Sequence, residues 1–202
     1  MYAPESDEPI PMTEAEYLAF ADEQDLRYEF RSGQIYAMSG GTYRHSRLIA
    51  NTITHLSIGL DETECEVTSE STRVHIASKS AYRYPDTDVV CGGPEFLEGR
   101  EDTITNPALL VEVLSPSTEV IDRNEKLEEY TAIPTLQAYV LISQDRPKVE
   151  VYRRGDDNKW LYEFVTGLDA TIDVPFAGEI LRIELAAVYR RVGFDDEQFE
   201  GD

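Results

Sequence analysis

The stretch LLVEVLSPSTEVIDRNEKLEEY, residues 109–130, places one carboxylate, Glu112, inside a short apolar run of the kind found in buried strands. An ionised carboxylate removed from water is costly unless it is paired with a cation or bound to a metal. Pro116 ends the run, and the acidic segment after it has the pattern of a capped helix that carries Lys126. The stretch therefore predicts a buried strand followed by a helix, and a partner for Glu112.

The length and composition favour one domain with a sizeable core, because 41% of the 202 residues are hydrophobic. We expect an acidic N-terminal lead over residues 1–12, one domain over 13–193 and an acidic C-terminal tail over 194–202. No run approaches the roughly 18 apolar residues of a membrane span. The acidic N-terminus also lacks the pattern of a signal peptide. We therefore expect a cytoplasmic protein without a membrane partner.

The charge balance is strongly acidic, with 18 basic and 40 acidic residues and a formal net charge of -22. Such a surface repels polyanions on average, which argues against extensive nucleic-acid binding. Arg44, Arg47, Arg123 and Lys126 are nevertheless placed to form a local positive rim around a negative site. We expect any engagement of phosphates to be confined to that rim.

The two cysteines, Cys65 and Cys91, match neither a disulfide framework nor a zinc-binding pattern. Free cysteines are usually small buried side chains. We interpret both cysteines in that way and assign them no function.

The order of the expected elements indicates an α/β or α+β fold. Thr13 and Glu16 have the spacing of a capping box and predict a short helix, and residues 26–41 alternate around Ser32-Gly33 like a hairpin. Apolar residues at three- and four-residue steps predict a helix over 43–58. Further strands are expected at 65–70, 72–77, 84–92, 108–115, 136–143, 148–154 and 159–167, and a strand with a short helix over 178–192.

The helix after residue 116 has a place in this layout. It lies between two strand-like runs, so it is suited to be a crossover that joins parallel strands. A mixed central sheet flanked by helices is therefore expected.

Strand alternation groups the acidic residues of two runs. Asp86 and Asp88 share one face of their strand, and Glu112 shares a face with Leu110 and Leu114. If the two strands are neighbours, a carboxylate from each meets over the sheet, and their repulsion raises a pKa unless a cation intervenes. Oxygen ligands without clustered histidines favour Mg²⁺ or Mn²⁺.

Lys126 lies about two and a half turns into the following helix, from where it reaches back towards a phosphate at the strand ends. The alternative role of Lys126 is that of an i, i+3 or i+4 partner for Asp122, Glu129 or the neighbours of Glu125 on an exposed helix face. Asp86 follows Pro85, so its alternative interpretation is a turn residue without a catalytic role. Asp88 is interpreted as an exposed or secondary acid. His45 lies on the apolar stripe of its helix, which favours a satisfied, partly buried histidine over a catalytic one.

Five sequence blocks together carry a family resemblance. They are RYEFRSGQIYAMSGG (27–41), RHSRLIANTITHL (44–56), YPDTDVVC (84–91), LLVEVLSPST (109–118) and DRNEKLEEY (122–130). This set, which is followed by LQAYVLIS and VEVYRR, resembles the Uma-two family of the PD-(D/E)XK superfamily over roughly residues 13–193. The resemblance implies a restriction endonuclease-like core, with a mixed central β-sheet flanked by helices, and a nuclease that depends on a divalent metal.

The resemblance also implies roles for individual residues. Asp86 matches the acid of the PD element, and Glu112 matches the first acid of the (D/E)XK element. Leu114 stands where that element has its lysine, and Lys126 occupies the place of the substitute lysine in the next helix. Glu29 matches a family acid near the site.

Three functional hypotheses follow. The first is a Mg²⁺-dependent or Mn²⁺-dependent endonuclease in which Asp86, Glu112 and the Val113 carbonyl hold the metal, Lys126 stabilises developing charge and Glu29 assists. The second is a catalytically weak or inactive protein that acts as an acidic, homodimeric binding module. The third, a glycosidase with two carboxylates, ranks last because no sugar-stacking aromatic platform is evident.

Overall fold

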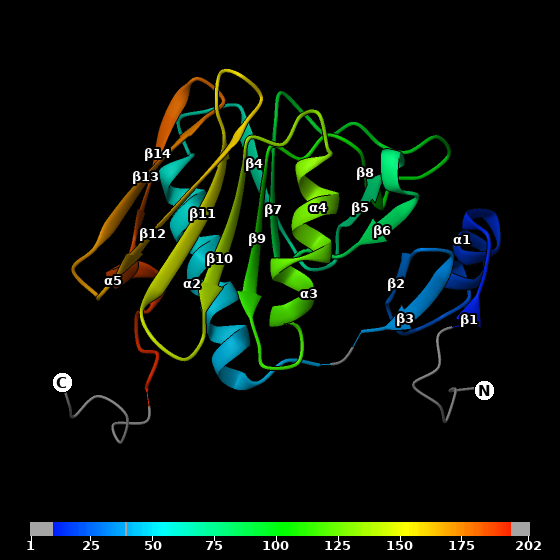
Figure 1. The fold of residues 1–202 in the computed structure, drawn as a ribbon, viewed down its shortest axis with the longest axis horizontal. Coiled ribbons are helices and arrows are strands. Elements are labelled where there is room, and N and C mark those ends of the chain that lie inside the picture. Colours follow the sequence, from blue (N-terminus) through cyan, green and yellow to red (C-terminus); the bar gives the residue numbers. More distant parts are fainter. Residues whose placement is uncertain (1–9, 39, 195–202) are drawn as a thin grey trace.

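The computed structural model describes residues 10–38 and 40–194, which form a central sheet with a covering layer on each face (Figure 1). Most of the acidic lead and tail expected at residues 1–12 and 194–202 lies outside the described residues. Among the described residues, no helix combines the length and the apolar character needed to cross a membrane.

The central sheet has the order β12-β11-β10-β9-β7-β4. Its middle strands β9 and β10 run parallel, and the other neighbouring pairs run antiparallel. All six residues of β9 are buried because both faces of this strand are covered. The strands are β4 (Cys65–Ser69), β7 (Thr87–Cys91), β9 (Leu109–Leu114), β10 (Ala138–Ser143), β11 (Lys148–Arg154) and β12 (Trp160–Thr166).

Two short helices make the crossover between the parallel strands. They are α3 (Glu119–Arg123) and α4 (Glu125–Thr131), and they lie against the same face of the sheet (Figure 1). The sequence predicted one continuous helix here, but the chain breaks at Asn124, whose backbone is not helical. The predicted crossover between parallel strands is confirmed.

The second sheet, order β1-β3-β2-β6-β5-β8, lies beside the first. Helix α1 (Glu14–Asp22) covers it, and the predicted Thr13–Glu16 capping box is present. Tyr17 of α1 is fully buried against Phe30 and Tyr82. The strands are β1 (Ile10–Pro11), β2 (Tyr28–Arg31), β3 (Gln34–Ala37), β5 (Arg73–Ile76), β6 (Ala81–Arg83) and β8 (Thr103–Ile104), with a 3₁₀ turn over Ala77–Lys79.

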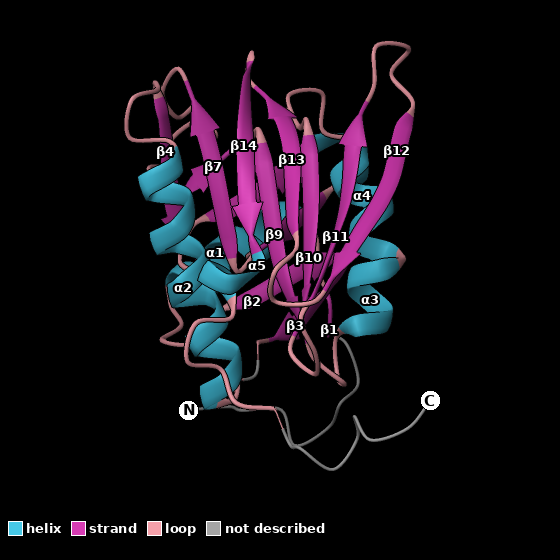
Figure 2. Ribbon diagram, turned by 90° about the vertical axis from the view of Figure 1, so that its left-hand side faces the viewer, coloured by secondary structure: helices cyan, strands magenta, loops and turns pink. Residues whose placement is uncertain are grey.

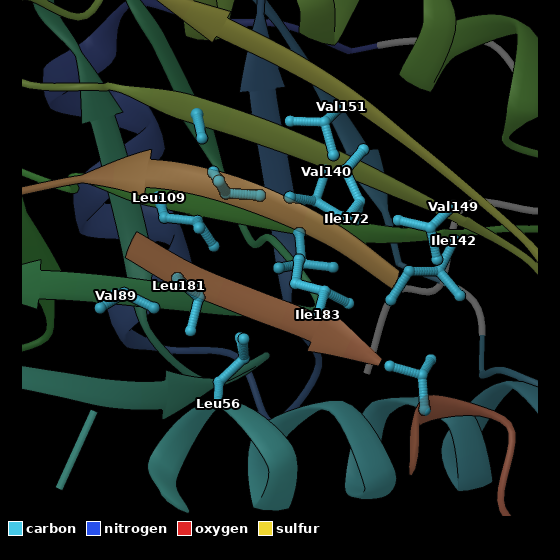
Figure 3. Packing of buried hydrophobic residues seen from close by; sticks show 14 of the residues in the cluster. Leu56, Val89, Leu109, Val140, Ile142, Val149, Val151, Ile172, Leu181 and Ile183 are labelled. Carbon is cyan, nitrogen blue, oxygen red and sulfur yellow. The ribbon is translucent and has the colours of Figure 1, made fainter. Parts of the chain in front are cut away.

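The opposite face of the central sheet is covered by α2 (Tyr43–Gly59), the hairpin of β13 (Thr171–Phe176) and β14 (Glu179–Glu184), and α5 (Leu185–Val188) (Figure 2). Figure 3 shows Leu56 of α2 and Leu181 of the hairpin on the side of Val89 and Leu109 of the sheet, and Ile172 of the hairpin beside Val140 of β10. Strand β13 was not predicted, because the proline in its sequence disfavours a strand assignment and only the pairing with β14 makes it one.

Cys65 and Cys91 form a disulfide, so the interpretation as two free buried side chains is wrong. They lie directly opposite each other in the antiparallel pair β4–β7, with their Cα atoms 4.0 Å apart, and both are half-buried. The pairing depends on the register of two strands that are 26 residues apart in sequence. Spacing along the chain contains no information about that register.

Candidate active site

Asp86 and Glu112 meet where β7 and β9 are neighbours. The antiparallel register pairs Thr87 with Val111, and its continuation by one residue sets Asp86 opposite Glu112. Oδ2 of Asp86 accepts a hydrogen bond of 2.7 Å from the Val113 backbone N–H. The Asp86 carboxylate therefore lies beside the peptide bond that joins Glu112 to Val113.

His45, in the first turn of α2, holds the other oxygen of Asp86. Its Nε2 lies 3.2 Å from Asp86 Oδ1, and its Nδ1 is buried without a hydrogen-bond partner among the described residues. Burial tends to lower the pKa of His45, but the hydrogen bond and charge of Asp86 raise it overall. A Cβ on Gly41 would lie 2.5 Å from the His45 ring, so the glycine of this turn leaves room for the imidazole.

Glu112 is only 4% exposed, and its carboxylate has two donors from helix α4. Oε1 accepts hydrogen bonds of 2.8 Å from Lys126 Nζ and of 2.8 Å from the Tyr130 hydroxyl. Burial raises the pKa of Glu112 well above its ordinary value; Lys126 opposes this rise, and the charges of Asp122 and Asp86 add to it. The buried carboxylate that the sequence left without a partner is thus paired, within a group of like charges.

Lys126 is buried, so the exposed-face alternative is wrong, although the predicted contact with Asp122 exists. Its Nζ lies 2.8 Å from Glu112 Oε1, 3.1 Å from Asp122 Oδ1 and 3.8 Å from Glu29 Oε1. Burial alone would lower the pKa of Lys126, but Glu112, Glu29 and Asp122 together raise it. The lysine remains a cation at the centre of three carboxylates.

Glu29 is held in place by Arg83, a residue that sequence reasoning missed. Arg83 is completely buried and pairs with Glu29 at 2.7 Å, with Glu125 at 2.8 Å and with Glu129 at 2.7 Å. Burial tends to raise the pKa of Glu29, but Lys126 and Arg83 lower it overall. Arg83 lies just before the PD element, yet its local sequence gives no sign of three carboxylate partners.

Asp88 is fully buried, so its interpretation as an exposed acid is wrong. The β4–β7 register sets Thr68 opposite Asp88, and the Thr68 hydroxyl donates a 2.7 Å hydrogen bond to Oδ2. Oδ1 has no hydrogen-bond partner among the described residues, and burial raises the pKa of Asp88 to about 6. Asp88 does not line the pocket described next.

The predicted site residues surround one pocket of about 630 Å³, here called the acidic pocket. The chemistry-bearing side chains come from strands β2 and β9, from the residue that precedes β7, from the start of α2, and from helices α3 and α4. They are Glu29, His45, Asp86, Glu112, Asp122 and Lys126, and Val113 contributes backbone.

The predicted positive rim is present only in part. Arg123 does not line the acidic pocket and instead makes ion pairs of 2.8 Å with Glu119 and 2.7 Å with Glu150. Arg44 and Arg47 line a neighbouring pocket instead.

The donors of the acidic pocket fit a hard divalent cation in part. In the described residues no three His, Cys, Asp or Glu side chains are arranged as a ready metal site. Two carboxylates nevertheless meet there, and Oε2 of Glu112 accepts no hydrogen bond from any described residue. Mg²⁺ takes one or two carboxylates and keeps several waters, so Asp86 and Glu112 suffice for a site of this kind.

A mixed sheet with an acid before one strand, an acid within its neighbour and a lysine from the next helix defines a restriction endonuclease-like protein. The chain belongs to the Uma2 (Uma-two) family, described as "Putative restriction endonuclease", whose model matches residues 14–184. The predicted family and fold class are confirmed.

Two relatives come from Synechocystis sp. The uncharacterized protein sll1609 is 34% identical over 165 residues, which cover 82% of this chain and 93% of that protein. The uncharacterized protein slr1290 is 37% identical over 156 residues, which cover 76% of this chain and 80% of that protein. A crystal structure titled as a putative nuclease belonging to DUF820 from Anabaena variabilis superposes with a TM-score of 0.71 and 22% identity, covering 89% of this chain and 98% of that chain.

Proposed function

We propose that this protein is a nuclease that depends on a divalent metal and hydrolyses phosphodiester bonds in nucleic acid. The observation that supports this function best is the hydrogen bond from the Val113 N–H to Asp86, which places the acid before β7 beside the peptide bond between Glu112 and Val113 in β9. Membership of a family described as "Putative restriction endonuclease" supports the same reaction class.

Asp86, Glu112 and the Val113 carbonyl are the groups proposed to hold Mg²⁺ or Mn²⁺. A bound ion of this type lowers the pKa of a coordinated water and polarises the scissile phosphate. His45 positions Asp86 through the 3.2 Å contact between them. Tyr130 holds Oε1 of Glu112, which leaves Oε2 of Glu112 as the oxygen available to a cation.

Lys126 is proposed to stabilise the negative charge that develops on the phosphate. A fixed cation in a water-poor pocket acts strongly on such charge. Glu29 is proposed to assist by keeping Lys126 charged and in place, because it lies 3.8 Å from Nζ and is itself fixed by Arg83.

A hydrolysis assay with matched variants tests this function. Wild type is expected to cut DNA or RNA in Mg²⁺ or Mn²⁺ and to stop when the metal is chelated. Asp86→Asn and Glu112→Gln keep the side-chain shapes and are each expected to lower the rate at least 100-fold, about the loss seen when a transition-state contact is removed. Asp88→Asn, outside the pocket, is expected to keep full activity. Equal rates in all four proteins would refute the proposal.

A second function is favoured by one observation: Lys126 already neutralises Glu112. In this alternative the acidic pocket is a structural ion-pair centre, and the protein is a homodimeric interaction module. Sedimentation equilibrium tests the dimer. A thermal melt that Mg²⁺ and Mn²⁺ leave unchanged would favour the alternative, because a ligand that binds only the folded state must raise its stability.

A further inference from the structure

A second pocket, of about 540 Å³, adjoins the acidic pocket. Both are lined by Thr42, Pro116 and Gln144, so the two form one continuous depression. Its lining residues include the segment after β9 and the start of α2. Figure 1 shows that β9 finishes and α2 begins at the same end of the central sheet.

Three arginines line this second pocket, here called the arginine pocket: Arg44, Arg47 and Arg191. Among the described residues one acid, Asp145, also lines it, so the formal balance of this lining is positive in a chain whose net charge is -22. The cations come from two distant segments, the start of α2 and the residues after α5. Tertiary structure therefore concentrates positive charge beside the acidic pocket.

Two of these arginines have no carboxylate partner among the described residues, unlike other arginines of this protein. Arg83, Arg100 and Arg123 each contact at least two carboxylates. Within residues 10–38 and 40–194, the side chains of Arg47 and Arg191 have no ion pair and no hydrogen bond, and Nε of Arg47 is buried as well. A buried donor without an acceptor is costly, and guanidinium groups match phosphate oxygens well.

Tyr43 adds an aromatic surface to the same pocket. It is the first residue of α2, it lines the arginine pocket, and it is 84% exposed. An exposed aromatic ring beside guanidinium groups is the combination that binds single-stranded nucleic acid, because bases stack on the ring while cations hold the phosphates. A base inside a duplex is already stacked on both sides, so an exposed aromatic ring of this kind favours an unpaired base.

We propose that the arginine pocket binds the unpaired nucleotide next to the scissile phosphate, with Tyr43 stacking on its base and Arg47 and Arg191 holding its phosphates. This inference rests on the proposed nuclease function and specifies its substrate as single-stranded nucleic acid or a frayed duplex end. The acidic surface elsewhere repels the rest of the strand, so the protein contacts only a short segment of it, and binding is strongly salt-dependent.

Fluorescence anisotropy of the full chain with chelator present tests this binding without hydrolysis. The probes are labelled single strands of about 12 nucleotides, as DNA and as RNA, and the matching DNA duplex. Single strands are expected to bind at least fivefold more tightly than the duplex. The Arg47→Gln and Arg191→Gln double variant is expected to weaken binding at least tenfold. It should also reduce the slope of log K against log salt by about 1.4, because each lost contact removes about 0.7.

Tyr43→Ala is expected to weaken binding at least threefold, and Tyr43→Phe is expected to retain it. The matched control is the Lys159→Gln and Arg182→Gln double variant, which removes the same charge from exposed positions outside both pockets. It should bind like wild type, with a similar salt slope. Duplex binding as tight as single-strand binding, or equal losses in the control, overturns the inference.

The hydrolysis assay separates this inference from the proposed function. If wild type binds single strands through Arg47 and Arg191 but hydrolyses nothing with any metal, the nuclease function fails and the binding site stands. If hydrolysis depends on Asp86 and Glu112 while the arginine and tyrosine variants keep the wild-type KM and affinity, the nuclease function stands and the arginine pocket has no role in binding.

Discussion

The Lys126 ammonium lies 2.8 Å from the Glu112 carboxylate, and both side chains are more than nine-tenths buried. Fourteen residues separate them in sequence. Strand β9 supplies the acid and helix α4 supplies the base, so the crossover between parallel strands creates the pair. The same two residues are central to the proposed chemistry, and removal of either one would leave the other buried without its partner.

Lys126→Met is expected to destabilise the protein by about 3 kcal/mol or more, because it leaves Glu112 and Asp122 buried without their cation. The double variant with Glu112→Gln should be less destabilised than the sum of the single changes. Urea unfolding measures both. Lys159→Met, at an exposed position, is the control and should change stability by less than about 0.5 kcal/mol. A loss below about 1 kcal/mol for Lys126→Met would contradict the buried pairing.

Asp88→Asn is expected to stabilise the protein at high pH. The folded-state pKa of Asp88, about 6, lies above the ordinary 3.8, so the fold favours the protonated acid. The stability that this group contributes is complete below pH 3.8 and is lost as the pH rises through 6. Asparagine avoids that loss, which corresponds to about 2 to 3 kcal/mol.

Unfolding of Asp88→Asn and wild type at pH 8 and pH 4 checks this expectation. The variant should be more stable at pH 8, and the difference should shrink towards pH 4. Asp157→Asn, at an exposed position, should show no such difference. A stability change that is the same at both pH values would argue against burial of an ionisable Asp88.

Addition of Mg²⁺ or Mn²⁺ is expected to raise Tm if Asp86 and Glu112 bind the ion. At a metal concentration about ten times Kd the gain is about 1.4 kcal/mol, or roughly 3 °C for a chain of this size. Differential scanning calorimetry of wild type and Asp86→Asn measures it. The gain should vanish in Asp86→Asn and persist in Asp88→Asn. A gain that survives in Asp86→Asn would place the metal elsewhere.

Loss of the Cys65–Cys91 disulfide is expected to destabilise the protein by about 3 kcal/mol, because the bond closes a long loop in the unfolded chain. The double variant Cys65→Ala and Cys91→Ala should unfold at lower urea than oxidised wild type. Reductant should shift the wild-type curve and leave the variant unchanged. Alkylation followed by mass spectrometry provides the direct check, since two modified thiols in untreated protein would show that the bond does not form.

The local elements followed from local patterns. The capping box at Thr13 and Glu16, the turn at Ser32-Gly33 and the apolar steps of α2 each involve residues close in sequence, and each predicted element is present. Strand β13 and the break at Asn124 were missed because they depend on pairing and packing with distant segments.

The candidate site residues were named from a motif, but their surroundings were not predictable. Nothing near Arg83 in sequence indicates that it is buried among Glu29, Glu125 and Glu129. Nothing near Arg191 indicates that it lines a pocket with Arg47. Such contacts join residues that are far apart along the chain.

The sequence by itself determined most of the helices and strands, the family and the need of Glu112 for a partner, because periodicity, caps and buried charge are properties of neighbouring residues. Only the tertiary structure decided which partner that is, where Asp88 lies and that the cysteines are joined. Those outcomes depend on strand order and register, which set distances between segments that no local pattern encodes.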